Sequence, residues 1–275
     1  MNMFDPLTDH GQDILVEIRK GGGLFQEDRA FYGNIVRLNT ITGKEERIAY
    51  NRGDILEFVA DREKTIRIGM AQHGLVRSIL HRRDANSEWE EVYSGDFRTA
   101  IAPLGFGKNP DILYVSAPNG DKKALFQFDL KKKKLGRMIF AHPTYDVPAG
   151  PPIVSDKTDK VIGVRYEAER SQVYWFNKDY QQYQAMIDKS LPGMANDIKN
   201  WSRSEDLILF HSHSEKTIGS YYLLDISNKK KPKMEKLLDL AGWIDPQKMS
   251  PMKSIKYIAR DGLVIHAFLT IPNGS

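Results

Sequence analysis

The chain has 275 residues, of which 41% are hydrophobic and 28% are charged, with a formal net charge of +4. This composition is typical of a folded protein and excludes wholesale disorder. No apolar run approaches the roughly 18 residues of a membrane helix, so the sequence predicts no membrane span. Cysteine is missing from the sequence, which excludes disulfides, thiolate nucleophiles and cysteine-ligated metal sites.

The amino terminus predicts no secretory signal, because a basic segment followed by an apolar stretch is missing from MNMFDP. This leaves the compartment open between cytoplasm and periplasm.

An internal repeat organises most of the chain. Short apolar runs end in Asp or Asn, and the closing residues Asp129, Asn177 and Asp225 are spaced 48 residues apart. Four copies of this run are visible, at residues 35–39, 125–129, 173–177 and 221–225, and a weaker fifth copy at residues 75–79 ends in Ile79. In three copies, an earlier apolar run lies upstream, at residues 111–115, 159–164 and 206–210. A further short strand is expected after each copy, at residues 47–49, 91–93, 137–139, 185–187 and 236–238.

Each copy predicts an antiparallel meander, because its runs are rich in Val, Ile, Leu and aromatic residues and are separated by polar turns such as 42–43 and 118–121. One such sheet cannot cover both of its own faces, and radial stacking of four-stranded sheets solves this. The sequence therefore predicts an all-β fold, a β-propeller of about five blades over residues 1–242. A β-sandwich is the alternative, but it gives no reason for a constant interval. Residues 21–23 and 25–31 predict a flexible loop inside the first copy.

The segment 243–275 differs from the repeat and predicts a separate structure. A connector containing Pro and Met leads to two apolar runs, which are joined by Arg260-Asp261-Gly262. Asp-Gly between such runs is typical of a β-hairpin turn. We therefore expect a boundary near residue 242, followed by a hairpin outside the propeller.

Parts of this segment resemble a known family. Residues 250–252, Tyr257, residues 260–262 and residues 268–272 resemble the crossover from propeller to catalytic domain in the prolyl oligopeptidase family of serine peptidases. The most similar branch is that of the bacterial dipeptidyl aminopeptidases and acylaminoacyl-peptidase-like enzymes. Further similar segments extend the resemblance over nearly the whole chain, at residues 4–7, 14–16, 140–143 and 145–147.

The resemblance implies a parent enzyme with an α/β-hydrolase domain that carries a Ser, Asp and His triad. The sequence holds no Gly-x-Ser-x-Gly motif and no room after Pro272 for such a domain. We therefore expect a non-catalytic piece of a larger peptidase, with residues 243–275 as the first strands toward the missing domain. The implied partners are that hydrolase domain and, through the parent enzyme, peptide substrates. No catalytic residue, metal or cofactor is assigned to this chain, and substrate-binding residues stay unassigned.

Two histidines have a spacing compatible with metal binding. In a strand, His211 and His213 lie on one face. No carboxylate or third histidine stands at a spacing that completes a ligand set, so the sequence favours two partly exposed strand histidines. His266 is expected to face the missing domain or solvent. The remaining histidines are scattered and have no nearby nucleophile: His10, His73, His81 and His142.

Two lysine runs, residues 131–134 and 229–231, are a possible nucleic-acid patch. Each run follows the closing Asp of a repeat, which places it at an exposed hairpin tip, where solvated charge is ordinary. The sequence therefore predicts binding neither to nucleic acid nor to a membrane.

Other repeated residues have structural explanations. We expect the strand aromatics to form a core between blades, namely Tyr174, Trp175, Tyr221 and Tyr222. The repeated Asp111, Asp159 and Asp206 are expected to stabilise turns. Residues 145–152 predict a rigid loop that lines either a channel or an inter-domain face.

The expected function is steric. A propeller over the active site of the parent enzyme would admit short or unfolded peptides and exclude folded proteins and bulk water. The alternative is a free-standing propeller that acts as a protein-interaction scaffold. A propeller hydrolase with a central metal ranks last, because the sequence lacks the required set of inward carboxylates and histidines.

Overall fold

A computed structural model describes residues 2–7, 11–19 and 32–274. The predicted loop at 21–23 and 25–31, and His10, lie outside the described residues. The chain divides into two compact units, Met1–Ile153 and Val154–Ser275. The predicted boundary at residue 242 is not tested by this division and stays a prediction.

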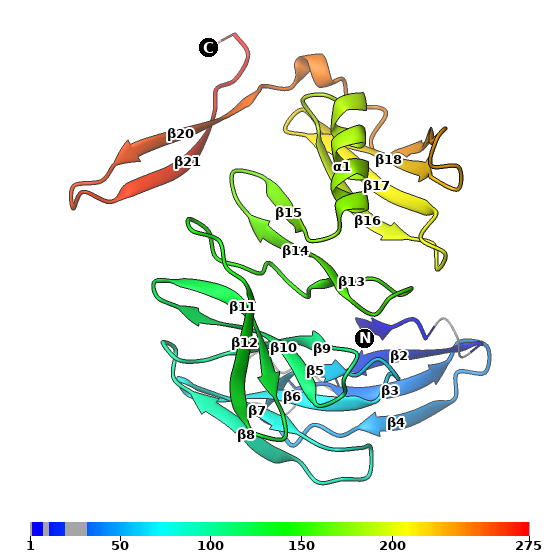
Figure 1. Cartoon of the computed structure of the whole chain (residues 1–275), viewed down its shortest axis with the longest axis vertical. Coiled ribbons are helices and arrows are strands. Elements are labelled where there is room, and N and C mark those ends of the chain that lie inside the picture. Colours follow the sequence, from blue (N-terminus) through cyan, green and yellow to red (C-terminus); the bar gives the residue numbers. More distant parts are fainter. Residues whose placement is uncertain (1, 8–10, 20–31, 275) are drawn as a thin grey trace. The chain divides into compact units, whose positions relative to one another are not determined.

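The first unit holds three antiparallel four-stranded sheets, each in the order of the sequence (Figure 1). The first sheet contains β1 (Asn2–Asp5), β2 (Asp13–Ile18), β3 (Asn34–Asn39) and β4 (Glu45–Ala49). The second contains β5 (Ile55–Ala60), β6 (Ile66–His73), β7 (Val76–His81) and β8 (Glu90–Gly95). The third contains β9 (Ala102–Phe106), β10 (Ile112–Asn119), β11 (Lys122–Asp129) and β12 (Lys134–Phe140).

The second unit contains a three-stranded sheet, a four-stranded sheet and a two-stranded hairpin. The fourth sheet has three strands and is followed by a helix: β13 (Ile153–Val154, at the division), β14 (Val161–Glu167), β15 (Ser171–Trp175) and α1 (Lys178–Ser190). The fifth sheet has four strands: β16 (Ala195–Trp201), β17 (Leu207–Ser214), β18 (Thr217–Asp225) and β19 (Lys233–Asp239). A short 3-10 helix, η2 (Pro246–Lys248), precedes the hairpin of β20 (Met252–Ile258) and β21 (Val264–Thr270).

The five sheets are blades of a β-propeller, as the repeat predicts. Neighbouring residues of one strand show the packing, because Ile79 and Leu80 of β7 point to opposite faces of the second sheet. Ile79 joins a core with Leu113 and Phe128 of the third sheet, whereas Leu80 joins a core with Leu15 of the first sheet. The second blade is therefore buried on both faces, which agrees with the four consecutive buried residues at the start of β6.

Two buried arginines connect adjacent blades of the first unit. Arg82 donates from Nε to the carbonyl of Ile66 (2.6 Å) and from a terminal nitrogen to that of Ile48 (3.3 Å), which lies in β4. Arg67 donates to the carbonyl of Pro110 at 3.1 Å, just before β10. Both guanidinium groups therefore bond to backbone carbonyls of a neighbouring blade. The sequence pattern gave no indication of this role.

The repeated closing residues share one local function. Asn39 accepts the backbone N–H of Thr42 at 2.8 Å, Asp129 accepts that of Lys132 at 2.9 Å, and Asp225 accepts that of Ser227 at 2.9 Å. Side chains of this kind stabilise a turn by hydrogen bonding to the backbone two or three residues further on. The repeat in the sequence is thus a repeat of capped turns.

The prediction of a strand at residues 185–187 is wrong, because these residues lie in α1. Asn177, the closing residue of that copy, accepts the backbone N–H groups of Asp179 and Tyr180 and so caps a helix. The following sequence lacks turn-forming Gly and Pro until residue 192 and contains Gln, Ala, Met and Lys, which favour a helix. Buried Tyr180 and Ile187 anchor α1, and Tyr180 contacts Trp175 and Trp201 through its ring.

The hairpin at the end of the chain forms as predicted. Strands β20 and β21 pair in register from Met252 opposite Thr270 to Ile258 opposite Val264. Gly262 has a φ of 85°, which is unfavourable for residues with a Cβ, and it takes the position that the Asp-Gly pair indicated. The two strands form a sheet of their own, so no further strand covers their edges among the described residues.

In the described part of the chain, no helix is both long and apolar enough to cross a membrane.

Candidate functional site

Three ligand-type side chains meet on the fifth sheet. Asp197 of β16 is the cross-strand partner of His211 of β17, and His213 follows two residues later on the same face. One ligand atom from each residue lies within 4.8 Å of the others. The sequence predicted the shared face of the two histidines but no carboxylate beside them, and that second prediction is wrong.

The contacts inside this Asp197–His211–His213 cluster are polar and well defined. His213 Nε2 lies 3.2 Å from Asp197 Oδ2, and the rings of His211 and His213 are stacked with centroids 4.8 Å apart. Lys199 Nζ donates to the same Asp197 oxygen at 3.0 Å. All the side chains of the cluster are partly exposed, so solvent reaches them.

One hydrogen bond fixes the tautomer of His211. Its Nε2 lies 2.8 Å from the backbone carbonyl oxygen of Ile218. A carbonyl oxygen only accepts, so Nε2 carries the proton and Nδ1 of the neutral ring keeps its lone pair. The stacked ring of Tyr221, 5.0 Å away, holds the imidazole from the β18 side.

The electrostatics of the cluster favour a neutral His211 and an ionised Asp197. Burial lowers the pKa of His211, although the hydrogen bond to Ile218 opposes this effect. Burial alone would raise the pKa of Asp197, but the hydrogen bonds and charges of Lys199 and His213 outweigh it and hold the pKa below its ordinary value. These are the protonation states in which both groups act as metal ligands.

A β-bulge explains why Asp197 faces the histidines. Near the β16–β17 turn, Trp201 pairs with Ile208 and Asn200 with Leu209. The register then shifts between Ile198 and Asn200, with Lys199 as the extra residue. Without the shift, Asp197 would pair with a residue on the opposite face, because moving the register by one residue exchanges the two faces.

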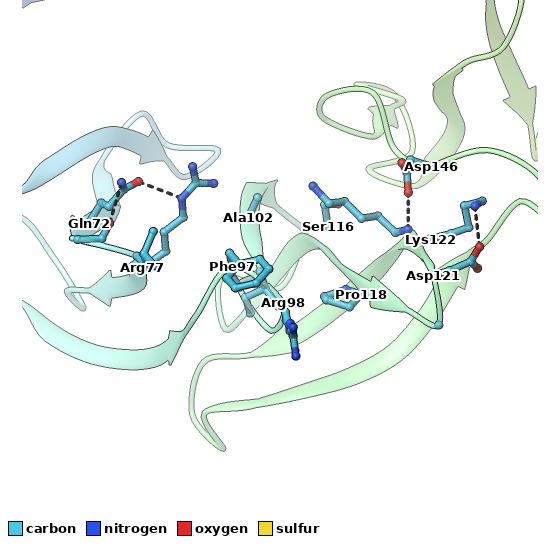
Figure 2. Close-up of a pocket in the computed structure, with 16 residues that line it drawn as sticks. Gln72, Arg77, Phe97, Arg98, Ala102, Ser116, Pro118, Asp121, Lys122 and Asp146 are labelled. Atoms are coloured by element: carbon cyan, nitrogen blue, oxygen red, sulfur yellow. Dashed lines mark hydrogen bonds and ion pairs between the residues drawn. The ribbon is translucent and has the colours of Figure 1, made fainter. Parts of the chain in front are cut away.

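The first unit contains a separate pocket of about 510 Å³ (Figure 2). It lies where the β6–β7 hairpin, the β10–β11 hairpin and the segment between β8 and β9 meet. Asp146, from the predicted rigid loop at 145–152, also lines it and accepts the backbone N–H of Lys123 at 2.7 Å. Part of that loop therefore lines a pocket within the first unit.

The chemistry of this pocket is that of a binding surface. Its cationic side chains are Arg77, Arg98, Lys122 and Lys123, against the two carboxylates of Asp121 and Asp146. Exposed Leu75 and Phe97 add apolar surface. Ser116 brings a hydroxyl group, but no histidine is found among the described residues that line the pocket. The described lining therefore holds no Ser–His pair.

The other described histidines are dispersed, as predicted. His73 Nε2 lies 3.2 Å from Asp54 Oδ2, and His81 Nε2 lies 3.0 Å from a guanidinium nitrogen of Arg67. Nδ1 of His142 accepts two backbone N–H groups, and His266 lies 3.7 Å from a carboxylate oxygen of Glu169. Burial lowers the pKa of His81, and the charge of Arg67 adds to this effect.

The lysine runs lie in the turns between β11 and β12 and between β18 and β19, as predicted. Lysines of the first run pair with carboxylates, Lys131 with Asp111 at 2.6 Å and Lys133 with Glu90 at 2.5 Å. In the second run, Lys229 pairs with Asp179 of α1 at 2.8 Å. Their charge is therefore partly balanced locally.

The predicted aromatic core is only partly correct. Trp175 is buried at 4% exposure, whereas Tyr174 is 45% exposed on the other face of β15. Tyr222 stacks on buried Phe210, but Tyr221 contacts His211. Among the repeated aspartates, Asp206 accepts the hydroxyls of Ser202 and Ser204 within its turn, as expected of a turn residue.

Comparison with solved structures places the fold. The chain is similar to dipeptidyl peptidase 4 of Porphyromonas gingivalis, with a TM-score of 0.53 and 12% identity over 86% of this chain and 35% of that one. It is also similar to prolyl oligopeptidase B from Galerina marginata bound to a 35mer substrate, with a TM-score of 0.56 and 10% identity over 95% of this chain and 37% of that one. The matched parts are the propeller regions of these peptidases.

A third similar structure is TolB from Acinetobacter baumannii, with a TM-score of 0.52 and 11% identity over 95% of this chain and 62% of that one. The chain thus spans well under two thirds of the length of the peptidases it resembles. No family model matches the sequence, and no curated protein matches it. The resemblance to the prolyl oligopeptidase family is therefore supported in the fold, at low sequence identity.

Proposed function

We propose that this chain is the β-propeller portion of a prolyl oligopeptidase-like serine peptidase. Its role is to control which peptides reach a hydrolase active site formed by another part of the same polypeptide. The observation that carries the proposal is the sixth sheet, because the hairpin β20–β21 follows the fifth blade and buries neither of its faces.

The faces of this hairpin have the character of an interface. Tyr257, Val264 and Phe268 are each more than half exposed, and Ile255 and Leu269 add further apolar surface. A two-stranded hairpin is at best marginally stable alone and needs a covering layer. Ile255, Tyr257 and Leu269 lie on one face and Val264 and Phe268 on the other, so both faces present exposed apolar side chains of the kind that marks an interaction site. We assign the covering layer to the hydrolase domain that the resemblance to the prolyl oligopeptidase family implies.

The mechanism is steric selection. A ring of blades above an active site restricts entry to chains that fit its opening and keeps bulk water from the reacting groups. The bond-breaking step then belongs to the Ser, Asp and His of the hydrolase domain. The pocket of Figure 2 supplies cationic and apolar groups, which suit an anionic peptide segment with a hydrophobic side chain.

The first experiment reads the coding sequence on both sides of this segment. The proposal expects a hydrolase domain after residue 272, with Gly-x-Ser-x-Gly followed in order by Asp and His. A stop codon directly after Ser275 would refute the enzyme proposal and favour a free-standing interaction scaffold.

A hydrolysis assay then tests the gating role. The 275-residue chain alone is expected to release no product from a chromogenic dipeptide or a longer peptide. The full polypeptide is expected to cleave short peptides and to leave a folded protein with the same cleavage sequence intact. Equal cleavage of the folded protein and the peptide would contradict steric selection.

A further inference from the structure

We propose that Asp197, His211 and His213 form a binding site for a divalent transition-metal ion of the Zn²⁺ class. The inference does not depend on the proposed function, because it concerns only the geometry of the fifth sheet.

The distances between the ligand atoms are compatible with one bound metal ion. In a tetrahedral zinc site with bonds of about 2.0–2.1 Å, two ligand atoms lie about 3.3 Å apart. His213 Nε2 and Asp197 Oδ2 are 3.2 Å apart, and the third ligand atom lies within 4.8 Å of both. Shortening the longest of these separations, at most 4.8 Å, to about 3.3 Å brings all three atoms to one ion.

The backbone holds the ligands in place. Asp197 and His211 are cross-strand partners, and His213 is two residues from His211 in a strand paired on both sides. His211 donates its Nε2–H to the carbonyl of Ile218, which leaves Nδ1 as the ligand atom. Metal-bound histidines almost always donate their other ring N–H to a carbonyl or carboxylate in this way.

The ligand types select the class of ion. Two imidazoles and one carboxylate suit Zn²⁺ and other late first-row metals, whereas Ca²⁺ and Mg²⁺ prefer oxygen ligands. Three protein ligands on a partly exposed face leave a fourth position for water.

Two cationic side chains, Lys199 and Arg165, interact with Asp197, and their positive charge disfavours binding of a cation. Lys199 bonds to Asp197 Oδ2 at 3.0 Å, and the charge of Asp197 also acts on Arg165. Arg165 is held by the carbonyl of Ile198, but Lys199 is partly exposed and free to leave when an ion binds. Lys199 is therefore a competitor whose removal strengthens metal binding.

The test is an isothermal titration calorimetry experiment. Zn²⁺ is added to the full 275-residue chain after a chelator has removed any bound metal. One Zn²⁺ per chain is expected to bind. His211→Ala, His213→Ala and Asp197→Asn are each expected to weaken binding by at least about tenfold. Lys199→Met is expected to strengthen it by about fivefold, since one unit charge near the ion is removed.

His73→Ala is the matched control. His73 and Asp54 form a histidine–aspartate pair with the same 3.2 Å separation, but without a second imidazole on their face. This variant is expected to bind Zn²⁺ like the unaltered chain. Co²⁺ serves as a spectroscopic probe, because tetrahedral nitrogen and oxygen ligands give it an intense visible absorption. Asp197→Asn and His213→Ala should remove this absorption. Their far-UV circular dichroism should stay unchanged, which shows that the variants are folded.

Three results would overturn the proposal. These are no stoichiometric binding of Zn²⁺, equal loss of affinity in His73→Ala, and weaker rather than stronger binding in Lys199→Met. The last variant keeps all three ligands, so it decides the question even if a ligand variant fails to fold.

Discussion

The fifth sheet and the terminal hairpin follow one another in the same unit and have similar apolar strands, yet their environments differ. In β17, Ile208 and Phe210 are fully buried, whereas β20 is exposed throughout and β21 is exposed except for half-buried Ile265 and Ala267. In both regions, successive side chains of a strand point to opposite faces of the sheet. The difference teaches that strand pattern produces a core only where a neighbouring layer covers the face.

The largest expected effect tests this difference directly. Phe210→Ala removes a ring that is 0% exposed and stacked on Tyr222, and we expect a loss of about 3–5 kcal/mol in the free energy of unfolding. Phe268→Ala removes a ring that is 54% exposed, and we expect a change within about 0.5 kcal/mol in this chain. Urea unfolding of both variants measures the two values. Similar losses would mean that the hairpin is covered in this chain.

The sequence allowed prediction of the blades because their turns are capped by a repeated residue type. Asn39, Asp129 and Asp225 each accept backbone N–H groups at the same place in the first, third and fifth sheets, so their recurrence indicates a repeated sheet. The same chemistry misled the prediction at Asn177. An Asn that accepts N–H groups two and three residues ahead caps either a turn or a helix, and the choice depends on the residues that follow.

The candidate metal site was half predictable for a similar reason. The shared face of His211 and His213 follows from strand periodicity, which is local. The position of Asp197 depends on the bulge at Lys199, which changes the register of β16 and has no clear mark in the sequence. Pairing partners across a bulged hairpin therefore had to come from the structure.

The second expected effect is a pH dependence of the fifth sheet. In the folded chain, burial lowers the pKa of His211. The pKa of Asp197 is also lowered, because the hydrogen bonds and charges of Lys199 and His213 outweigh the opposite effect of burial. The unfolded chain therefore binds more protons, and the free energy of unfolding falls on acidification. We expect one decrease below about pH 6.5 from His211 and another below about pH 4 from Asp197.

Urea midpoints between pH 7 and pH 3, with a chelator present, measure this dependence. His211→Gln should reduce the first decrease, to which His81 also contributes, and Asp197→Asn should reduce the second, which Asp197 shares with other carboxylates such as Asp54. His266→Gln, in the hairpin, serves as the control and should leave both decreases unchanged. If His266→Gln removed the first decrease and His211→Gln did not, the decrease would belong to His266 and the prediction for His211 would be wrong.

A third, smaller effect concerns deletion of the hairpin. The described contacts of residues 249–275 with the rest of their unit include the bond from Asn273 Nδ2 to the carbonyl of Lys248 and the 3.7 Å contact between His266 and Glu169, both at exposed side chains. We therefore expect the urea midpoint of the remaining chain to change little. Binding of a hydrophobic dye should fall, because exposed apolar surface is removed. A large drop in the midpoint would show that the hairpin already packs on a blade.

The smallest effect is expected at a charged hairpin tip, the counterpart of the apolar hairpin. Lys131 and Lys133 lie between β11 and β12 and pair with Asp111 and Glu90 at the surface. Because exposed ion pairs contribute little to stability, replacing both lysines with Ser should leave the urea midpoint unchanged within error. The same variant tests the nucleic-acid prediction by fluorescence anisotropy with a labelled DNA duplex. Neither protein should bind at physiological salt, whereas salt-sensitive binding that the double variant loses would identify the tip as a phosphate-binding patch.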